Sequence, residues 1–304
     1  MLYLYMEGKK MSMTLHERSM HLLKKRIHSP RFKDKFNFIF LGDSRGRGNK
    51  DGCFTMSGEF ELVLKKAVEL DPLFIVHGGD TVFTGEIAYL KDFVRVVEKY
   101  APDIPVFVCL GNHDVPNQNP INLENFESII GKVHWVISIP SANFRCIAVN
   151  NLLSLSGPSK YGFTDQELSI LEKHLQNNPR NTVVAMHAEP EVGRWIGQDG
   201  FPINTPESQR FFDLIQQHHV KKVLVSHVHA YDEQFIMKNS DGTVTTGNGT
   251  DFVLSGGAGA ELENDPNLVL TLIDFHFVEF FVDRCNIRGP LLWRVFGTPR
   301  KPCI

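Results

Sequence analysis

A short polar stretch, Gly111-Asn112-His113-Asp114, follows directly on the apolar run 105–110. The glycine lets the chain turn sharply, the Asn offers a carbonyl oxygen, and the His can ligate a metal ion or move a proton near neutral pH. Open α/β sheets bind ligands beyond the carboxyl ends of their strands, so a loop of this kind after a strand is a candidate site. Taken alone, four residues are equally compatible with an ordinary loop.

The rest of the chain repeats the arrangement, because several other apolar runs also end in a carboxylate or an imidazole. The full set in chain order is Asp43, Asp80, Asn112 with His113 and Asp114, His187, His227 and His229. Oxygen and imidazole donors without thiolate suit Mn²⁺, Fe or Zn²⁺ better than Ca²⁺ or a structural zinc. Two such ions, about 3.5 to 4 Å apart, could share one carboxylate and act together on a phosphoryl group.

His227 and His229 can belong to this set only under a geometric condition. They are separated by one residue, so in a regular strand their side chains would point to opposite sides. Both can face one site only if the backbone turns between them.

The elements that must position these side chains alternate along the chain. Apolar runs at 36–41, 73–76 and 106–110 predict strands, and amphipathic patterns over 60–68 and 86–100 predict the helices between them. Strands joined by crossover helices indicate a buried parallel or mixed sheet. Strands are also expected at 133–138, 144–149, 182–186 and 222–225. Helices are expected at 164–176, with a capping box from Thr164 to Glu167, and from Thr205 onward.

The remainder of the chain, from 234 onward, consists of short apolar runs with turn signals, including 252–254, 268–275 and 277–282. This β-rich second half predicts two sheets packed face to face, with helices outside. We therefore expect an N-terminal extension over 1–35, either one amphipathic helix or a partly ordered tail, and a single domain over 36–304 with a β-rich C-terminal part.

Composition sets further bounds. Of 304 residues, 32 are Lys or Arg and 35 are Asp or Glu, so the formal charge of −3 offers no overall field for nucleic acid or an anionic membrane. Five scattered cysteines without a CxxC pair argue against a zinc-thiolate site and a disulfide framework, and favour a reducing compartment. No signal peptide or membrane span is visible. We expect a soluble, cytoplasmic protein; its oligomeric state stays open.

Taken together, these motifs resemble those of the calcineurin-like metallophosphoesterases, a family of binuclear phosphoesterases. The resemblance rests on five motifs in the same order, from Asp43 to His229: Asp43, Gly79-Asp80, Gly111-Asn112-His113-Asp114, His187 and His227-Val228-His229. It implies an α/β fold, a four-layer α/β/β/α sandwich of two mixed sheets with flanking helices. It also implies two divalent or mixed-valence metal ions, Mn, Fe or Zn.

The resemblance assigns a role to each residue. Asp80 would bridge the two ions, with Asp43 and His229 completing the first, and Asn112, His187 and His227 completing the second. His113 would approach the phosphoryl or leaving-group oxygen, and Asp114 would hold its imidazole in orientation. The implied reaction is hydrolysis of a phosphoester, in which metal-bound hydroxide attacks phosphorus in line and His113 assists the leaving group.

The sequence departs from the family pattern twice. Ser226 stands where glycine is usual before His227, which is a mild change. Arg45 stands where a ligating His is usual, and a guanidinium has no lone pair and stays protonated. At about 6 Å from a divalent ion, its charge costs roughly 5 kcal/mol at an effective dielectric of 20, before screening.

Two interpretations of Arg45 follow. In the first, which we favour from the sequence, water completes the first ion and Arg45 binds the substrate phosphate as a catalytic residue. In the second, Arg45 replaces the first ion. A different class of function, a non-catalytic scaffold that binds a protein partner, is also open because of Arg45. The sequence leaves open whether the substrate is a monoester, a diester, a nucleotide or a phosphoprotein.

Overall fold

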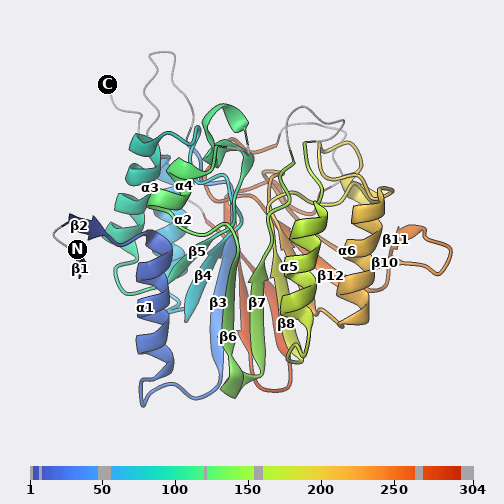
Figure 1. The fold of residues 1–304 in the computed structure, drawn as a ribbon, viewed down its shortest axis with the longest axis horizontal. Helices are drawn as coiled ribbons and strands as arrows, with labels where there is room; N and C mark the ends of the chain where they lie inside the picture. The colour runs from blue at the N-terminus through green and yellow to red at the C-terminus, as the bar shows by residue number, and fades with distance from the viewer. Residues whose placement is uncertain are drawn as a thin grey trace.

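Two sheets pack face to face in the computed structural model, with helices on their outer sides (Figure 1). The structure describes residues 3–6, 9–46, 56–119, 122–153, 160–263 and 270–295. Helices α1 to α4 lie beside the smaller sheet, and α5 and α6 lie beside the larger one (Figure 1). The four layers confirm the α/β/β/α sandwich that was expected from the sequence.

The smaller sheet supplies three parallel strands, β3, β4 and β5, whose ends carry the first site motifs. β13 pairs antiparallel with β3, and β14 pairs antiparallel with β13, so the sheet is mixed. In spatial order its five strands are β14 (Ile287–Arg294), β13 (His276–Val282), β3 (Phe36–Leu41), β4 (Phe74–His77) and β5 (Val106–Val108).

The larger sheet has a parallel centre formed by β12, β9, β8 and β7. Antiparallel strands flank this centre on both sides. In spatial order its seven strands are β11 (Val244–Thr246), β10 (Tyr231–Lys238), β12 (Thr250–Ser255), β9 (Lys222–Val225), β8 (Asn181–Ala185), β7 (Phe144–Ala148) and β6 (Trp135–Ile139). A separate hairpin, β1 (Tyr3–Met6) with β2 (Lys9–Ser12), precedes the first helix.

Side-chain caps begin most of the long helices. Thr14 and Glu17 form a capping box at the start of α1. The box expected at Thr164 forms only in part: the Thr164 hydroxyl accepts the Glu167 N–H at 3.2 Å, while the Glu167 carboxylate lies 3.2 Å from His134 instead. The helices are α1 (Leu15–Ile27), α2 (Gly58–Val68), α3 (Ile87–Tyr100), α4 (Glu124–Ile129), α5 (Asp165–Leu175) and α6 (Pro206–Gln217).

Side chains alternate between the two faces of each strand, so the core is divided into a layer between the sheets and layers beneath the helices. In β3, Phe38 and Phe40 face the apolar layer between the sheets, while Ile39 and Leu41 pack toward the helices. The Phe38 ring stacks on Phe280 with centroids 4.9 Å apart. Helix α1 joins this packing, because Leu15 and Leu23 are buried and the Ser19 hydroxyl donates to the Val106 carbonyl at 2.7 Å.

One expectation about the second half was wrong, and one strand was not foreseen. Residues 268–269 lie outside the described part of the chain, and 270–275 form no strand, making only an isolated bridge between Leu272 and Tyr231. Strand β14 was not among the strands expected from the sequence, and it contains Gly289 and Pro290, which are uncommon within strands. It lies at the edge of its sheet, where a proline costs no ladder hydrogen bond.

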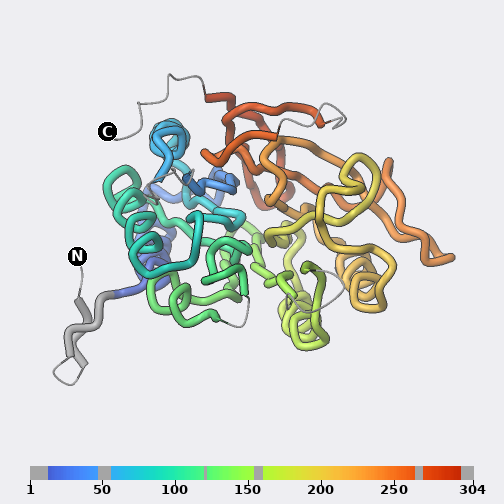
Figure 2. The backbone as a smooth tube through the Cα atoms, turned by 90° about the horizontal axis from the view of Figure 1, so that it is seen from above, coloured from blue at the N-terminus to red at the C-terminus, as the bar shows by residue number. Residues whose placement is uncertain are grey.

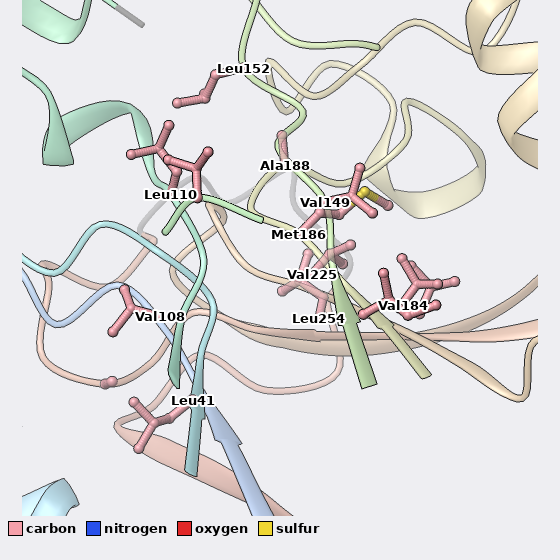
Figure 3. Packing of buried hydrophobic residues seen from close by; sticks show 14 of the residues in the cluster. Leu41, Val108, Leu110, Val149, Leu152, Val184, Met186, Ala188, Val225 and Leu254 are labelled. Carbon is pink, nitrogen blue, oxygen red and sulfur yellow. The ribbon is translucent and has the colours of Figure 1, made fainter. Parts of the chain in front are cut away.

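Viewed from above, the loops that follow the strands meet between the two halves of the sandwich (Figure 2). Buried apolar side chains stand immediately before the polar residues of these loops, among them Leu110, Met186 and Val225 (Figure 3). They fix where each loop leaves its sheet. Within the described ranges, no helix is both long enough and apolar enough to cross a bilayer.

The fold makes a prediction about acid stability through His77, which is fully buried at the end of β4. Burial, and then the charge of His187, lower the pKa of His77 from 6.5 to about 3, so the folded protein keeps the ring neutral while the unfolded chain protonates it. Its contribution is present above the unfolded pKa and is lost as the pH falls below it. Between pH 7 and pH 5, His77 should remove about 2 kcal/mol of stability.

Urea unfolding at a series of pH values tests this. In His77→Asn the decline in unfolding free energy between these pH values should be shallower by about that amount. The same change at the exposed His21 should leave the slope as it is. Equal slopes for His77→Asn and the unmodified protein would contradict the assignment.

Candidate metal centre

Backbone hydrogen bonds hold the loops after β3 and β4 together. The Asp43 N–H donates to the Gly79 carbonyl at 3.0 Å, and the Arg45 N–H donates to the Asp80 carbonyl at 3.1 Å. On the other sheet, the Ser226 N–H donates to the His187 carbonyl at 2.7 Å, which joins the loops after β8 and β9. The candidate ligands therefore rest on loops that are tied to one another in pairs.

Three of the site residues adopt a left-handed backbone conformation, which residues other than glycine rarely do. The φ angles are 58° at Asp43, 55° at Asp80 and 74° at His227. At His227 this turn resolves the geometric question raised by the sequence. The chain leaves the extended conformation there, and His229 Nε2 lies 3.7 Å from Asp43 Oδ1 while the His227 ring lies 5.1 Å from the His187 ring.

The strongest indication of a cation lies around His187. Its Nδ1 donates to the Gly78 carbonyl at 2.9 Å, so the lone pair is on Nε2. That nitrogen faces Asn112 Oδ1 at 3.1 Å and Asp80 Oδ1 at 3.5 Å. The Asn112 amide nitrogen is directed to Gln118 Oε1 at 3.3 Å, so Asn112 presents its oxygen. Three acceptors thus converge without a donor between them, which a metal ion would satisfy.

Asp43 adds a second indication. Its Oδ2 accepts the His227 N–H at 2.9 Å, whereas Oδ1 is buried and has no hydrogen-bond partner among the described residues. One ligand atom from each of Asp43, Asp80 and His187 lies within 4.8 Å of the other two. A buried, unpaired carboxylate oxygen in such a group fits a metal site.

The two carboxylates of this group differ in their pKa. Burial, and then the charge of Asp80, raise the pKa of Asp43 well above its usual value. Burial would also raise the pKa of Asp80, but interactions with His187, His113 and Arg45 together outweigh it and hold the pKa below the usual range. Asp80 therefore stays ionised at the centre of the site, and Asp43 gains most from a cation.

His113 is fixed by its neighbours on the β4 loop. Its N–H donates to Asp80 Oδ1 at 2.8 Å, and its ring Nδ1 donates to the Phe83 carbonyl at 2.7 Å. The other ring nitrogen, Nε2, faces Asp80 Oδ2 at 4.0 Å. His113 is therefore positioned at the edge of the candidate centre with Nε2 directed inward.

The structure corrects the role expected for Asp114. The Asp114 carboxylate does not hold the His113 imidazole, because the Phe83 carbonyl does. Asp114 instead accepts the N–H groups of Asp80, Thr81 and Gly111 at 2.9, 2.7 and 2.9 Å, and the Thr81 hydroxyl at 2.5 Å. Burial, and then the charge of Asp80, raise its pKa to about 7. Asp114 thus joins the β4 and β5 loops and is a positioning residue.

Small residues make this close approach possible. A Cβ at Gly111 would lie 2.0 Å from the Asp80 backbone nitrogen, so only glycine fits there. Gly42 and Gly78 likewise make room for Ser226, since a Cβ at either would lie 1.7 or 2.5 Å from its hydroxyl. The Ser226 hydroxyl donates to the Ser255 carbonyl at 3.0 Å, which explains how the chain accommodates this departure from the family pattern.

Arg45 reaches the same centre from the β3 loop. Its Nε lies 3.5 Å from Asp80 Oδ2, its Nη2 lies 3.4 Å from His229 Nε2, and its side chain is 22% exposed. The guanidinium carbon lies 5.8 Å from the centroid of the Phe83 ring. Arg45 therefore contacts two of the three ligands that the resemblance assigned to the first ion.

Several residues of the site were not expected from the sequence. Most act through the backbone: the Phe83 carbonyl orients His113, and the Glu261 carbonyl accepts from His229 Nδ1 at 2.5 Å. Every residue has a backbone carbonyl, so the residue type does not indicate which carbonyl will bind a site side chain. Tyr161 packs its ring 4.8 Å from His227, and only its place in a loop after a strand could have pointed to it.

The loop over 188–204 packs on β10 through two of its side chains. Arg194 binds both oxygens of Asp232, at 2.9 and 2.8 Å, and the buried Trp195 donates its indole N–H to Asp232 at 2.9 Å. In this structure the two side chains are engaged with the sheet.

The chain belongs to the calcineurin-like phosphoesterase family, whose sequence profile matches residues 28–231. The family is one of phosphoesterases, and membership indicates this class of activity for the chain. It also implies the use of divalent metal ions at a binuclear centre, for which Asp43, Asp80 and His187 form a candidate site. No curated protein sequence matches the chain.

Solved structures share the fold at low sequence identity. The purple acid phosphatase PPD1 from yellow lupin (Lupinus luteus) seeds has a TM-score of 0.59 and 19% identity, covering 83% of this chain and 50% of its own. This chain therefore spans about half of the lupin protein. GAP50, described as the anchor in the inner membrane complex of Plasmodium, has a TM-score of 0.51 and 14% identity, covering 88% of this chain and 91% of its own.

The hydrogen bonds of Asp114 predict that Asp114 contributes more to stability than its neighbour His113. Asp114→Ala leaves buried donors on both loops unpaired, so it should lower the free energy of unfolding by about 2 to 4 kcal/mol. His113→Asn removes only a ring at the edge of the site and should cost about 1 kcal/mol or less. Denaturant unfolding of both variants without added metal measures the difference. Equal losses would contradict the role of Asp114 in joining the two loops.

Proposed function

We propose that this protein hydrolyses a phosphoester, using a divalent metal ion held by Asp43, Asp80 and His187 with the Asn112 amide oxygen. The observation that supports this most directly is that His187 Nε2, Asn112 Oδ1 and Asp80 Oδ1 converge as acceptors with no donor among the three. His227 lies beside His187 and is a further ligand in this proposal. The oxygen and imidazole donors favour Mn, Fe or Zn.

The chain's own residues supply the rest of the chemistry. When bound, a divalent ion lowers the pKa of water and neutralises charge on a phosphoryl group. His113 is the proton donor in this proposal: its Nδ1 is taken by the Phe83 carbonyl, so Nε2 is the nitrogen that can protonate the departing oxygen. The ionised Asp80 stabilises the protonated ring from 4.0 Å. Direct attack by water on phosphorus requires no Ser or Cys nucleophile.

Arg45 completes the site in this proposal as a binding group for the phosphate. Its side chain is 22% exposed and its guanidinium can donate two parallel hydrogen bonds to phosphoryl oxygens. The setting we propose is a reducing, cytoplasmic one, supported by Cys109 and Cys146, which are buried free thiols.

Hydrolysis of a chromogenic phosphate monoester and of a diester tests the function. With saturating Mn²⁺ or Zn²⁺, the purified protein should turn over at least one of them, and EDTA should abolish turnover. His113→Asn should lower kcat by about 10²- to 10⁴-fold at unchanged metal content, because it removes the proton donor and no ligand. His21→Gln, on the exposed side of α1, is the matched control and should leave kcat unchanged.

A second candidate function is a non-catalytic scaffold that binds a protein partner. Arg45 favours it, because this residue stands in a metal motif, and GAP50, a fold relative, is described as an anchor. The same assay separates the two functions. Absence of both metal binding and hydrolysis with every metal tried would favour the scaffold.

A further inference from the structure

Arg45 lies where the first of the family's two ions would need its ligands. The β3 loop that carries it is held against the β4 loop by the Asp43 and Arg45 backbone N–H groups, so its origin is fixed close to Asp80. From there the side chain extends across the site to His229, touching both Asp80 and His229 on the way. It therefore bridges the two sheets at this point.

The lone pairs that Arg45 faces are those a first ion would use. His229 Nδ1 donates to the Glu261 carbonyl, so the ring lone pair is on Nε2, and Nε2 faces Arg45 Nη2 at 3.4 Å. The two carboxylate oxygens of Asp80 face different partners. Oδ1 accepts the His113 N–H and faces His187, whereas Oδ2 faces Arg45 Nε at 3.5 Å.

A permanent positive charge in this position does not fit a second cation beside it. The guanidinium cannot deprotonate to become a ligand, and it lies 3.5 Å from Asp80 Oδ2 and 3.4 Å from His229 Nε2, beside the atoms that a first ion would need. Asp43 Oδ1 remains as an unpaired acceptor, but it also belongs to the group that Asp43, Asp80 and His187 form within 4.8 Å. Asp43 can therefore bind the same ion as Asp80 and His187, and its free oxygen does not require a second metal site.

We propose that Arg45 replaces the first metal ion of the family, so that this protein binds one divalent ion per chain and uses the guanidinium as the second positive charge of its site. This inference rests on the proposed function, since it concerns the same site. It reverses the interpretation favoured from the sequence, in which water completed a first ion. The guanidinium then binds the phosphate from the side that the missing ion would have served.

Metal content measured by mass spectrometry, after loading with excess Mn²⁺ and removal of free ion, tests the proposal without reference to activity. The unmodified protein should hold one ion per chain. Arg45→His restores a ligand and removes the charge, and should hold two. Arg45→Gln removes the charge without adding a ligand, and is the matched control that should hold one. Circular dichroism verifies that each variant is folded.

Electron paramagnetic resonance of the Mn²⁺-loaded samples adds a spectroscopic signature. The unmodified protein should show the hyperfine pattern of an isolated ion, and Arg45→His should show a spin-coupled pair. Two ions in the unmodified protein, together with hydrolysis, would overturn this inference and leave the proposed function standing. No bound ion and no hydrolysis would overturn the proposed function itself.

Discussion

The structure of the site depends on keeping one buried carboxylate, that of Asp80, ionised. Burial opposes its charge, and His187, His113 and Arg45 compensate from three directions. The carboxylate can be surrounded in this way only because Asp114 draws the β4 and β5 loops together through their N–H groups. The sandwich supplies the strand ends, and hydrogen bonds between backbone and carboxylate set the distance between them.

This arrangement also accounts for the strained backbone at the centre of the site. Asp43, Asp80 and His227 adopt left-handed conformations immediately after parallel strands. Such turns direct the side chain back over the strand ends, at a cost of order 1 to 3 kcal/mol each. The surrounding hydrogen bonds and the close contact at Gly111 hold the turns in place. The loops are therefore fixed by these contacts and not by strand pairing.

The sequence allowed much of this to be predicted, for physical reasons that differ between fold and site. The apolar runs before Asp43, Asp80 and His187 sit in largely buried strands, where composition is most constrained, and they were placed within a residue or two. The edge strand β14 was missed because its Gly and Pro are tolerated only at an edge, which is a tertiary property. The orientation of His113 was misassigned, since the partner is the Phe83 carbonyl, which no residue type reveals.

Arg45 shows how a single substitution can change the electrostatics of a site without disturbing its frame. The neighbouring Asp43 and the more distant His229 remain, so the sequence alone favours retention of the first ion. The position of the guanidinium, 3.5 Å from Asp80 and 3.4 Å from His229, puts a fixed positive charge beside the atoms that a first ion would use. In the one-ion site that we propose, the guanidinium needs no metal supply, yet it provides one positive charge where an ion provides two, so the single ion and His113 would carry more of the developing charge.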